Sequence, residues 1–332
     1  MMRLPPFNYR GPTSLGDAVE LLAEAPPAQT ALVAGGTDLF PNMKRRQQEP
    51  RLLIGLRRIA ELRRIASTDD GGLAIGATVS LAHLASDTRV IADYPALAVA
   101  AGSVSTPHLR LMGTVGGNLC LDTRCNYYDQ SYHWRKSIDF CKKKDGDVCW
   151  VAPGSARCWA VSSSDTAPVA VALDARVRLA SARGERLVAA RDFFRDDGIL
   201  YLGRRPDELL TELLLPPAGE WRSVYLKLRR RGSFDFPILG VAGAALLVGD
   251  VVADVRLVLG AVASAPVDQS AIARAAIGQR PDVELVRAIA AEAYRGAHPL
   301  DNTDLNYAWR KKMARIYVER ALADVFGVQL DA

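Results

Sequence analysis

Four cysteines gathered in one stretch of the chain are the residues best suited to bind a metal. Five cysteines occur among the 332 residues, and four of them follow the spacing C-x15-C-x7-C-x8-C. These four are Cys125, Cys141, Cys149 and Cys158. Thiolates are ligands for zinc and for iron–sulfur clusters. Because the cysteine count is odd and no apolar leader opens the sequence, a framework of disulfides is not expected.

The spacing of these cysteines identifies no particular metal. Structural zinc sites favour close pairs of cysteines, and bacterial ferredoxins carry a run with two residues between successive cysteines. Neither pattern occurs here. Four thiolates from well separated points of a loop still fit a [4Fe–4S] cluster. An iron–sulfur cluster, a zinc site and four unligated thiols therefore remain open at this point.

The other reactive side chains of this region are predicted to have no chemical role. Cys120 stands in an apolar run, where a small buried and inert residue suits the packing. His133 lies between the first two candidate ligands and is predicted to be a surface residue or a neighbour of the site, since four cysteines already suffice. A G-x-S-x-G motif is missing, and no pair of carboxylates stands out for acid–base catalysis. No catalytic residue is predicted.

Two glycine-rich segments could bind phosphate. Ala34–Leu39 (AGGTDL) directly follows a predicted strand, and Gly113–Asn118 (GTVGGN) is predicted to be a second turn. Glycine lacks a Cβ, so the main-chain amides can approach an anion closely. The GxGxxG fingerprint is missing, which disfavours the usual dinucleotide fold. Two phosphate-binding loops suit a dinucleotide better than a ligand with a single phosphate.

Hydrophobic patterns predict an α+β protein whose elements deliver these segments. Residues 7–48 read as strand, helix, strand, loop and helix, and 51–67 as a strand and a short helix. Residues 73–87 read as a strand leading into a helix capped by Ser80, and a second helix follows over 95–102. Helical character is predicted to end at Thr106. A pair of strands is expected over Val169–Leu179.

The last third of the chain is predicted to form a separate domain. Residues 218–222 make a sensible boundary after a strand that two prolines stop. Three strands with β-type spacing follow, and two helices end the chain. One face of the final helix is expected to pack on the core. The residues assigned to that face are Leu305, Trp309, Met313, Ile316 and Leu322.

Charge and hydropathy exclude several classes of protein. The formal net charge of +5 is modest for this length and carries no nucleic-acid signal. No apolar run in the sequence approaches the 18 residues that a membrane-spanning helix needs, so no membrane partner is expected. A cytoplasmic protein is predicted.

Longer segments resemble a known family. AGGTDLFPNMK (34–44), RLMGTVGGN (110–118), SSSDTAP (162–168) and YLKLRRRGSFDFPI (225–238) are similar to the FAD-binding middle subunits of molybdenum hydroxylases, the xanthine dehydrogenase and carbon monoxide dehydrogenase family. The resemblance covers nearly the whole chain. It implies a two-subdomain FAD-binding fold of the PCMH (vanillyl-alcohol oxidase-like) type over residues 1–217. A smaller α+β domain with a three-stranded antiparallel sheet would occupy residues 218–332.

The same resemblance implies an FAD site. Main-chain amides of two segments would hold the pyrophosphate. Asp165 would accept a hydrogen bond from the ribityl or ring region, Leu210 would pack near the isoalloxazine, and Lys227 would place a cation beside its pyrimidine edge. The residues of the two segments are Ala34, Gly35, Gly36, Thr37, Asp38 and Leu39, then Thr114, Val115, Gly116, Gly117 and Asn118.

The cysteines lie in a segment that most family members lack. Those members pass from the Gly-Gly-Asn turn to the Ser-Asp turn in about a dozen residues, whereas roughly forty separate the two turns here. The insert, residues 121–161, resembles that of the flavoprotein subunits of the 4-hydroxybenzoyl-CoA reductase family. There it carries a [4Fe–4S] cluster. By this resemblance Cys125, Cys141, Cys149 and Cys158 are its ligands.

The resemblance also implies a function and partners. Electrons from ferredoxin would pass through [4Fe–4S] and FAD to [2Fe–2S] clusters on a small subunit and a molybdopterin centre on a large one, in a dimer of heterotrimers. 4-Hydroxybenzoyl-CoA would there be reductively dehydroxylated to benzoyl-CoA. An oxidising molybdenum hydroxylase acting on an aldehyde or N-heterocycle is the first alternative. A non-redox interaction module with a four-thiolate zinc site is the second.

Overall fold

The N-terminal segment forms a small three-stranded parallel sheet whose strands are connected by helices. The computed structural model describes residues 3–330. Strands β1 (Asn8–Arg10), β2 (Thr30–Val33) and β3 (Leu52–Gly55) pair in the order β1-β3-β2. Helix α1 (Leu15–Glu24) is capped by Ser14, whose Oγ accepts the amide of Asp17. Helix α2 (Leu39–Lys44) follows β2. All four predicted elements of residues 7–48 are present.

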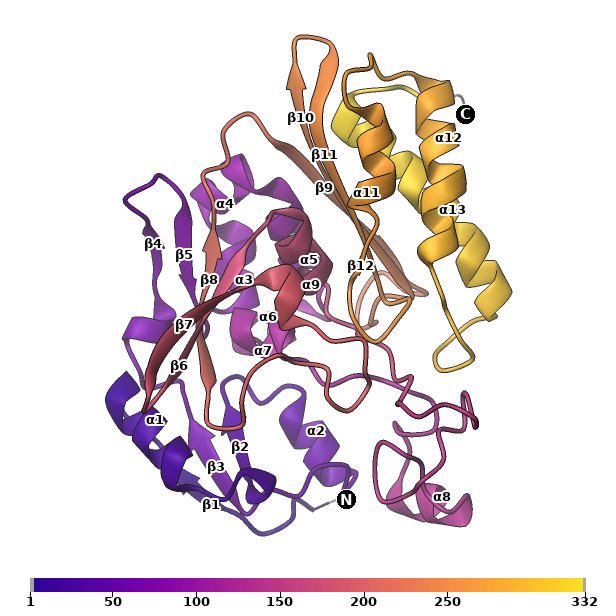
Figure 1. The fold of residues 1–332 in the computed structure, drawn as a ribbon. Coiled ribbons are helices and arrows are strands. Elements are labelled where there is room, and N and C mark those ends of the chain that lie inside the picture. Colours follow the sequence, from indigo (N-terminus) through magenta and orange to yellow (C-terminus); the bar gives the residue numbers. More distant parts are fainter. Residues whose placement is uncertain (1–2, 331–332) are drawn as a thin grey trace.

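A five-stranded antiparallel sheet forms the body of the molecule (Figure 1). Its order is β4-β5-β8-β6-β7, so the chain returns to it after a long excursion. The excursion consists of short helices that bury alanine, valine and leucine against the sheet. The strands are β4 (Ile65–Ser67), β5 (Leu73–Gly76), β6 (Arg176–Ser181), β7 (Gly184–Ala189) and β8 (Leu209–Leu215). The helices of the excursion are α3 (Leu81–Ser86), α4 (Thr88–Asp93), α5 (Pro95–Ser103), α6 (Pro107–Met112), α7 (Val115–Leu119) and α9 (Thr166–Ala172).

Two of these helices differ from the sequence-based expectation. Helix α5 ends at Ser103, and a new helix, α6, begins at Pro107. Proline fits the first turn of a helix, and Thr106 Oγ1 caps α6 by accepting the amide of Leu109. The predicted strand pair over Val169–Leu179 is wrong. Helix α9 occupies its first half and β6 its second, and Asp174, with φ of 55°, turns the chain between them. Every residue of α9 is buried, so its sequence shows no periodicity that would distinguish a helix from a strand.

The C-terminal part is a second antiparallel sheet covered by helices on one face (Figure 1). Strands β9 (Arg222–Leu228), β10 (Leu239–Val248) and β11 (Val251–Gly260) are the three predicted ones. A two-residue strand, β12 (Val267–Asp268), extends the sheet to four strands. The order is β12-β11-β10-β9. Helices α12 (Val283–Ala293) and α13 (Tyr307–Phe326) pack over it and share a core with its inner face.

The face predicted for helix α13 is buried only in part. Leu322 is fully buried and Met313 packs against the core, as predicted. Leu305, Trp309 and Ile316 are each about 40% exposed. The buried face consists mainly of smaller side chains, among them Ala314 and Val318. Small residues let the helix axis approach the sheet closely, and three of the five side chains predicted to be buried lie outside this contact.

The predicted insert leaves and rejoins the fold at one point. Arg124 and Val161 exchange backbone hydrogen bonds in both directions, at 2.8 and 2.7 Å. Between them, turns and one short helix, α8 (Tyr132–Ser137), form a compact loop beside α2, below the lower end of α13 in Figure 1. The remaining short elements are α10 (Ala190–Phe193), α11 (Ser270–Ala273) and the 3-10 turns Pro27–Gln29, Glu61–Arg63, Arg274–Ala276 and Tyr294–Gly296. Within residues 3–330, no helix is both long and apolar enough to cross a membrane.

A buried arginine holds α13 to the sheet, and its removal should destabilise the protein. The side chain of Arg310 is fully buried and donates to the carbonyl oxygens of Ile238, Ala261 and Leu300. Burial lowers its pKa to about 10. We expect Arg310→Met to reduce the free energy of unfolding by about 3 kcal/mol, because three buried carbonyls lose their donor.

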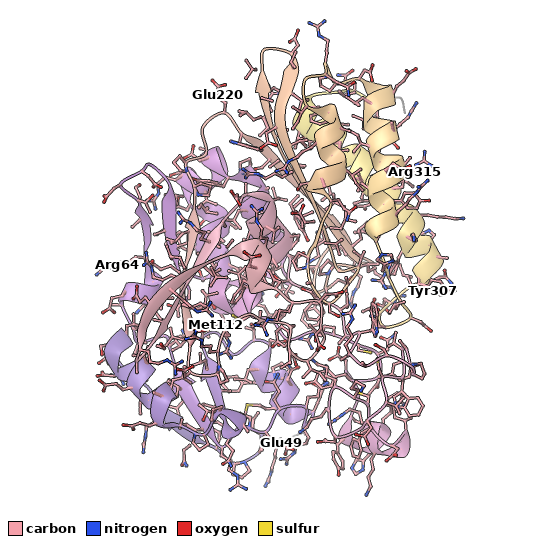
Figure 2. All side chains as sticks on the ribbon, in the orientation of Figure 1. Glu49, Arg64, Met112, Glu220, Tyr307 and Arg315 are labelled. Carbon is pink, nitrogen blue, oxygen red and sulfur yellow. The ribbon has the colours of Figure 1, made fainter. Side chains whose placement is uncertain are left out.

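Urea unfolding followed by circular dichroism checks this expectation. The matched control is Arg315→Met on the same helix, since Arg315 is exposed (Figure 2). The control should change the free energy of unfolding by less than about 0.5 kcal/mol. Equal unfolding curves for both variants would contradict the anchoring role of Arg310.

Candidate cofactor sites

The first glycine segment is an open cradle of main-chain amides. It connects β2 to α2, and Gly36 has φ of 71°, in the region that favours glycine. The amides of Gly35 to Leu39 donate to no acceptor within residues 3–330. Asp38 stands at the N-cap position without capping the helix. Consecutive free amides at the start of a helix make a concavity that attracts an anion.

The second glycine segment is a helical turn rather than an open loop. Thr114 Oγ1 caps α7 by accepting the amide of Gly117 at 3.1 Å. The neighbouring amides are also used: Val115 donates to Val79, Gly116 to Ala77 and Asn118 to Thr114. These four amides therefore serve the fold in this conformation. The role predicted for Thr114–Asn118 in holding a pyrophosphate stays a prediction.

The fold brings the two glycine segments into contact. A Cβ on Gly35 would overlap the carbonyl oxygen of Met112, at the end of α6. It would also lie 3.1 Å from the Cα of Gly113. A Cβ on Gly113 would in turn lie 3.6 Å from Thr37 Oγ1. Close approach of two backbones is the reason that these positions are glycine, and it places two segments that are far apart in sequence side by side.

The side chain of Asn118 has a structural role that sequence reasoning missed. Its Oδ1 accepts from Ser164 Oγ at 2.9 Å and from Thr166 Oγ1 at 2.7 Å. It also accepts the amide of Thr166 at 3.2 Å. All three residues are buried. Asn118 therefore fixes the start of α9, and with it Asp165, against α7.

Asp165 and Lys227, which the family resemblance assigned to the FAD site, lie in contact with each other. Lys227 Nζ lies 2.9 Å from Asp165 Oδ2 and also donates to the carbonyl of Ser103 at 3.0 Å. Tyr225, two residues earlier on β9, donates its hydroxyl to Asp165 Oδ1 at 2.8 Å. Burial raises the pKa of Asp165 and lowers the pKa of Lys227. Leu210 is buried in the core on β8.

The four predicted cysteine ligands line one cavity. The free space between the thiols is small, about 10 Å³. All four thiols are buried, although they come from four separate turns of the insert. Aromatic and basic side chains complete the lining, and Cys120 and His133 lie outside it. The cavity residues are Cys125, Tyr127, Tyr128, Cys141, Lys142, Lys143, Cys149, Trp150, Val151, Cys158 and Ala160.

The thiols of this cavity interact with one another. A hydrogen bond with Cys158 lowers the pKa of Cys149 to about 5 and raises that of Cys158. Burial raises the pKa of Cys125 to about 12, and burial also raises the pKa of Cys120 to about 11. In the described part of the chain, no group of three or more His, Cys, Asp or Glu side chains could hold a single metal ion.

A locked lysine and a glycine shape one wall of the cavity. Lys143 Nζ donates to Asp122, Thr123 and the carbonyl of Gly198 at 2.6 to 2.8 Å. A Cβ on Gly198 would lie 2.7 Å from Cys158 Sγ, so a larger residue there would displace the thiol. The wall is therefore built from both the insert and the chain between β7 and β8.

Comparison with known proteins assigns the fold. Residues 5–218 match the family described as the FAD binding domain in molybdopterin dehydrogenase, and residues 223–325 match the CO dehydrogenase flavoprotein C-terminal domain. The chain belongs to this flavoprotein family. The flavoprotein is therefore an FAD-binding subunit of the molybdenum hydroxylase type of oxidoreductase, and the family resemblance stated from the sequence is confirmed.

Individual relatives match the flavoprotein over most of its length. The aldehyde oxidoreductase FAD-binding subunit of Escherichia coli is 32% identical over 275 residues, which covers 78% of this chain and 82% of the relative. The glyceraldehyde dehydrogenase medium chain of Sulfolobus acidocaldarius is 26% identical and covers 97% and 99%. The structure of carbon monoxide dehydrogenase from Hydrogenophaga pseudoflava matches with a TM-score of 0.80 at 28% identity, covering 98% and 99%.

We expect Gly35→Ala to reduce FAD binding at least about tenfold. The added Cβ would push the cradle away from α6, and overpacking of this kind costs about 1–3 kcal/mol. Flavin fluorescence titration of the purified chain measures the dissociation constant. Gly232→Ala is the control, because a Cβ there meets no atom within 4 Å. FAD binding as tight as in the parent protein would contradict the placement of the cradle.

Proposed function

We propose that this chain is the flavin and iron–sulfur subunit of a molybdenum enzyme that reductively removes the phenolic hydroxyl of 4-hydroxybenzoyl-CoA. The observation that carries the proposal is the convergence of Cys125, Cys141, Cys149 and Cys158 on one buried cavity. When bound, the cluster and FAD supply electron transfer between ferredoxin and the molybdenum centre. The chemistry at the substrate, in which two electrons and two protons release the hydroxyl as water, would take place on another chain.

The shared cavity supports a site for four thiolates. A [4Fe–4S] cube takes one thiolate at each of its four irons, and four buried cysteines from separated points of the insert line one cavity. The family resemblance of the insert is what favours a cluster over a zinc ion here. Lys143 lines the same cavity, with its charge paired to Asp122.

The FAD site that we propose rests mainly on the first glycine segment. Residues 35–39 would bind the pyrophosphate through their free amides. Ala34 leads into this cradle, and Thr114–Asn118 would support it from α7. Lys227 and Asp165 would lie at the ring and ribityl end, with Leu210 against the isoalloxazine. In the present structure Lys227 and Asp165 pair with each other, and both retain further hydrogen-bonding capacity for a ligand.

The remaining assignments follow from the same proposal. The first domain would be a PCMH-type FAD-binding domain over residues 1–217, which contains the insert 121–161. The second domain would comprise residues 218–332. The partners would be a large molybdopterin subunit and a small [2Fe–2S] subunit in a dimer of heterotrimers, with ferredoxin as the donor. The names of the relatives support a multi-chain enzyme, since they are called subunits or medium chains.

An oxidising molybdenum hydroxylase is the second candidate. It is favoured by the names of the relatives, which include aldehyde, glyceraldehyde, carbon monoxide and nicotinate enzymes. In that case the electrons would leave the complex through this chain rather than enter it. The chain's own residues would bind the same two cofactors in both cases.

We expect the purified full chain, handled without oxygen, to contain about four irons and four sulfides with one FAD, as one cube and one flavin require. Cys141→Ser should lose most of the iron and keep the FAD. Iron and sulfide analysis with the visible absorption spectrum checks this. A folded parent protein with FAD and no iron would overturn the cluster proposal.

A glycine pair gives the matched control for the cavity. Gly198→Ala should lower the iron content by more than half, since its Cβ would lie 2.7 Å from Cys158 Sγ. Gly154→Ala in the insert should retain the iron, because a Cβ there has no atom within 4 Å.

Substrate assays separate the two candidate functions. We expect the assembled complex, given a reduced viologen and 4-hydroxybenzoyl-CoA, to produce benzoyl-CoA. Liquid chromatography of the thioesters measures the product. Iron-loaded complex that forms no benzoyl-CoA but oxidises an aldehyde or N-heterocycle would establish the oxidising alternative.

A further inference from the structure

The insert is attached to both ends of helix α2, the helix whose N-terminus belongs to the FAD cradle. Arg124 of the insert forms an ion pair with Asp38 at the start of α2. Arg135, on α8, donates to the carbonyl oxygens of Arg45 and Arg46 just past its end, at 3.3 and 2.8 Å. One short helix is therefore held at each end by a cation from the cysteine-bearing loop.

The side chain of Arg135 is held in a buried position between aromatic rings and two backbone carbonyls. Its side chain is fully buried, and its guanidinium lies about 6 Å from the ring centroids of Tyr132 and Phe140. Among the described residues its Nε and Nη1 have no hydrogen-bond partner. The carboxylate of Asp145 lies 3.9 Å from Nη1, so the hydrogen bonds of this buried cation depend on the two carbonyl acceptors. The two carbonyls after α2 are thus essential to the packing of the insert.

Arg124 acts at the other end of the helix, beside the free amides. Its side chain is 9% exposed. Besides Asp38 it contacts Asn42 Oδ1 at 3.3 Å and Asp129 Oδ1 at 3.1 Å. The carboxylate of Asp38 would repel a pyrophosphate bound at the neighbouring amides. Pairing with Arg124 offsets that charge and holds Asp38 turned toward the insert.

Two glutamines extend the contact between the insert and the chain after α2. Gln47 Nε2 donates to the carbonyl of Tyr128 at 2.6 Å, and Gln48 Nε2 donates to Asp122 Oδ2 at 3.0 Å. Tyr128 also lines the thiol cavity. These hydrogen bonds connect the wall of the thiol cavity to the segment that directly follows α2.

We propose that FAD and the iron–sulfur cluster bind cooperatively, with Arg124 and Arg135 as the positioning residues that join the two sites through α2. The inference rests on the proposed function, because it requires a cluster in the thiol cavity. A filled cavity orders the insert, the insert holds α2, and α2 presents the cradle to FAD. By thermodynamic linkage, FAD then stabilises the cluster by the same factor.

The experiment measures this coupling in the full chain. Flavin fluorescence gives the FAD dissociation constant with the cluster intact and after anaerobic removal of the iron by a chelator. We expect the constant to rise about five- to 150-fold when the cluster is removed, the usual range of coupling between sites. Equilibrium competition with the chelator, with and without saturating FAD, should give the same factor for iron.

The variants test the assigned residues. Arg135→Met should bring the coupling factor below about twofold. Lys136→Met, at the exposed next position of α8, should leave it unchanged. Arg124→Gln should reduce it in the same way as Arg135→Met. The readout is a ratio of dissociation constants in each protein, so a general loss of affinity does not imitate it.

The outcomes distinguish this inference from the function on which it rests. A parent protein that holds both cofactors and binds FAD equally well with and without the cluster overturns the cooperativity and leaves the proposed function standing. A parent protein that never holds iron overturns both. Coupling that persists in Arg135→Met and Arg124→Gln overturns the role of these arginines. Because the parent protein is measured first, a variant that fails to fold does not remove the test.

Discussion

A carboxylate buried between two sheets is the constraint around which this chain is arranged. Asp165 stands at the start of α9, which packs against β10 and β11. From β9, Lys227 pairs with its charge and Tyr225 donates a hydrogen bond to it. An unpaired carboxylate in this position would be very costly. The pair therefore requires the FAD-binding part and the C-terminal sheet to dock in one way. Asn118, by fixing the start of α9, extends the same requirement to α7.

Close approach between backbone segments is the second constraint on this structure. Gly35 lies against the end of α6, Gly116 against Ala77 of the turn after β5, and Gly198 against Cys158. Each contact joins segments that are distant in sequence, and each leaves no room for a Cβ. The two candidate sites are thus positioned by backbone packing as much as by side chains, which explains why their residues can be drawn from many short elements.

The sequence allowed some of this to be predicted and concealed the rest for identifiable physical reasons. Apolar residues at β-type spacing allowed strands β9 to β11 to be predicted, and the N-cap at Ser80 allowed helix α3 to be predicted. Helix α9 was missed because it is buried on all sides. The buried face of α13 was assigned only in part, because small residues such as Ala314 and Val318 supply much of the contact. Alternation along β9 places Tyr225 and Lys227 on one face, a signal that could have identified Tyr225.

The cysteines show both the power and the limit of sequence reasoning. Their spacing left zinc, iron–sulfur and unligated thiols open, because only the folded loop shows that all four face one cavity. Lys143 and Gly198 could not be foreseen, since Gly198 reaches the cavity wall across a gap of about forty residues and Lys143 is one of three adjacent lysines.

The two backbone hydrogen bonds between Arg124 and Val161, at the two ends of the insert, have an evolutionary consequence. A segment whose two ends are hydrogen-bonded to each other can be lengthened without moving the fold on either side of it. Extending a connection from about a dozen to about forty residues costs only about 1 kcal/mol in loop-closure entropy. The cysteine-bearing loop could thus be acquired or lost by insertion between these two residues, while the flavoprotein that carries it keeps its architecture.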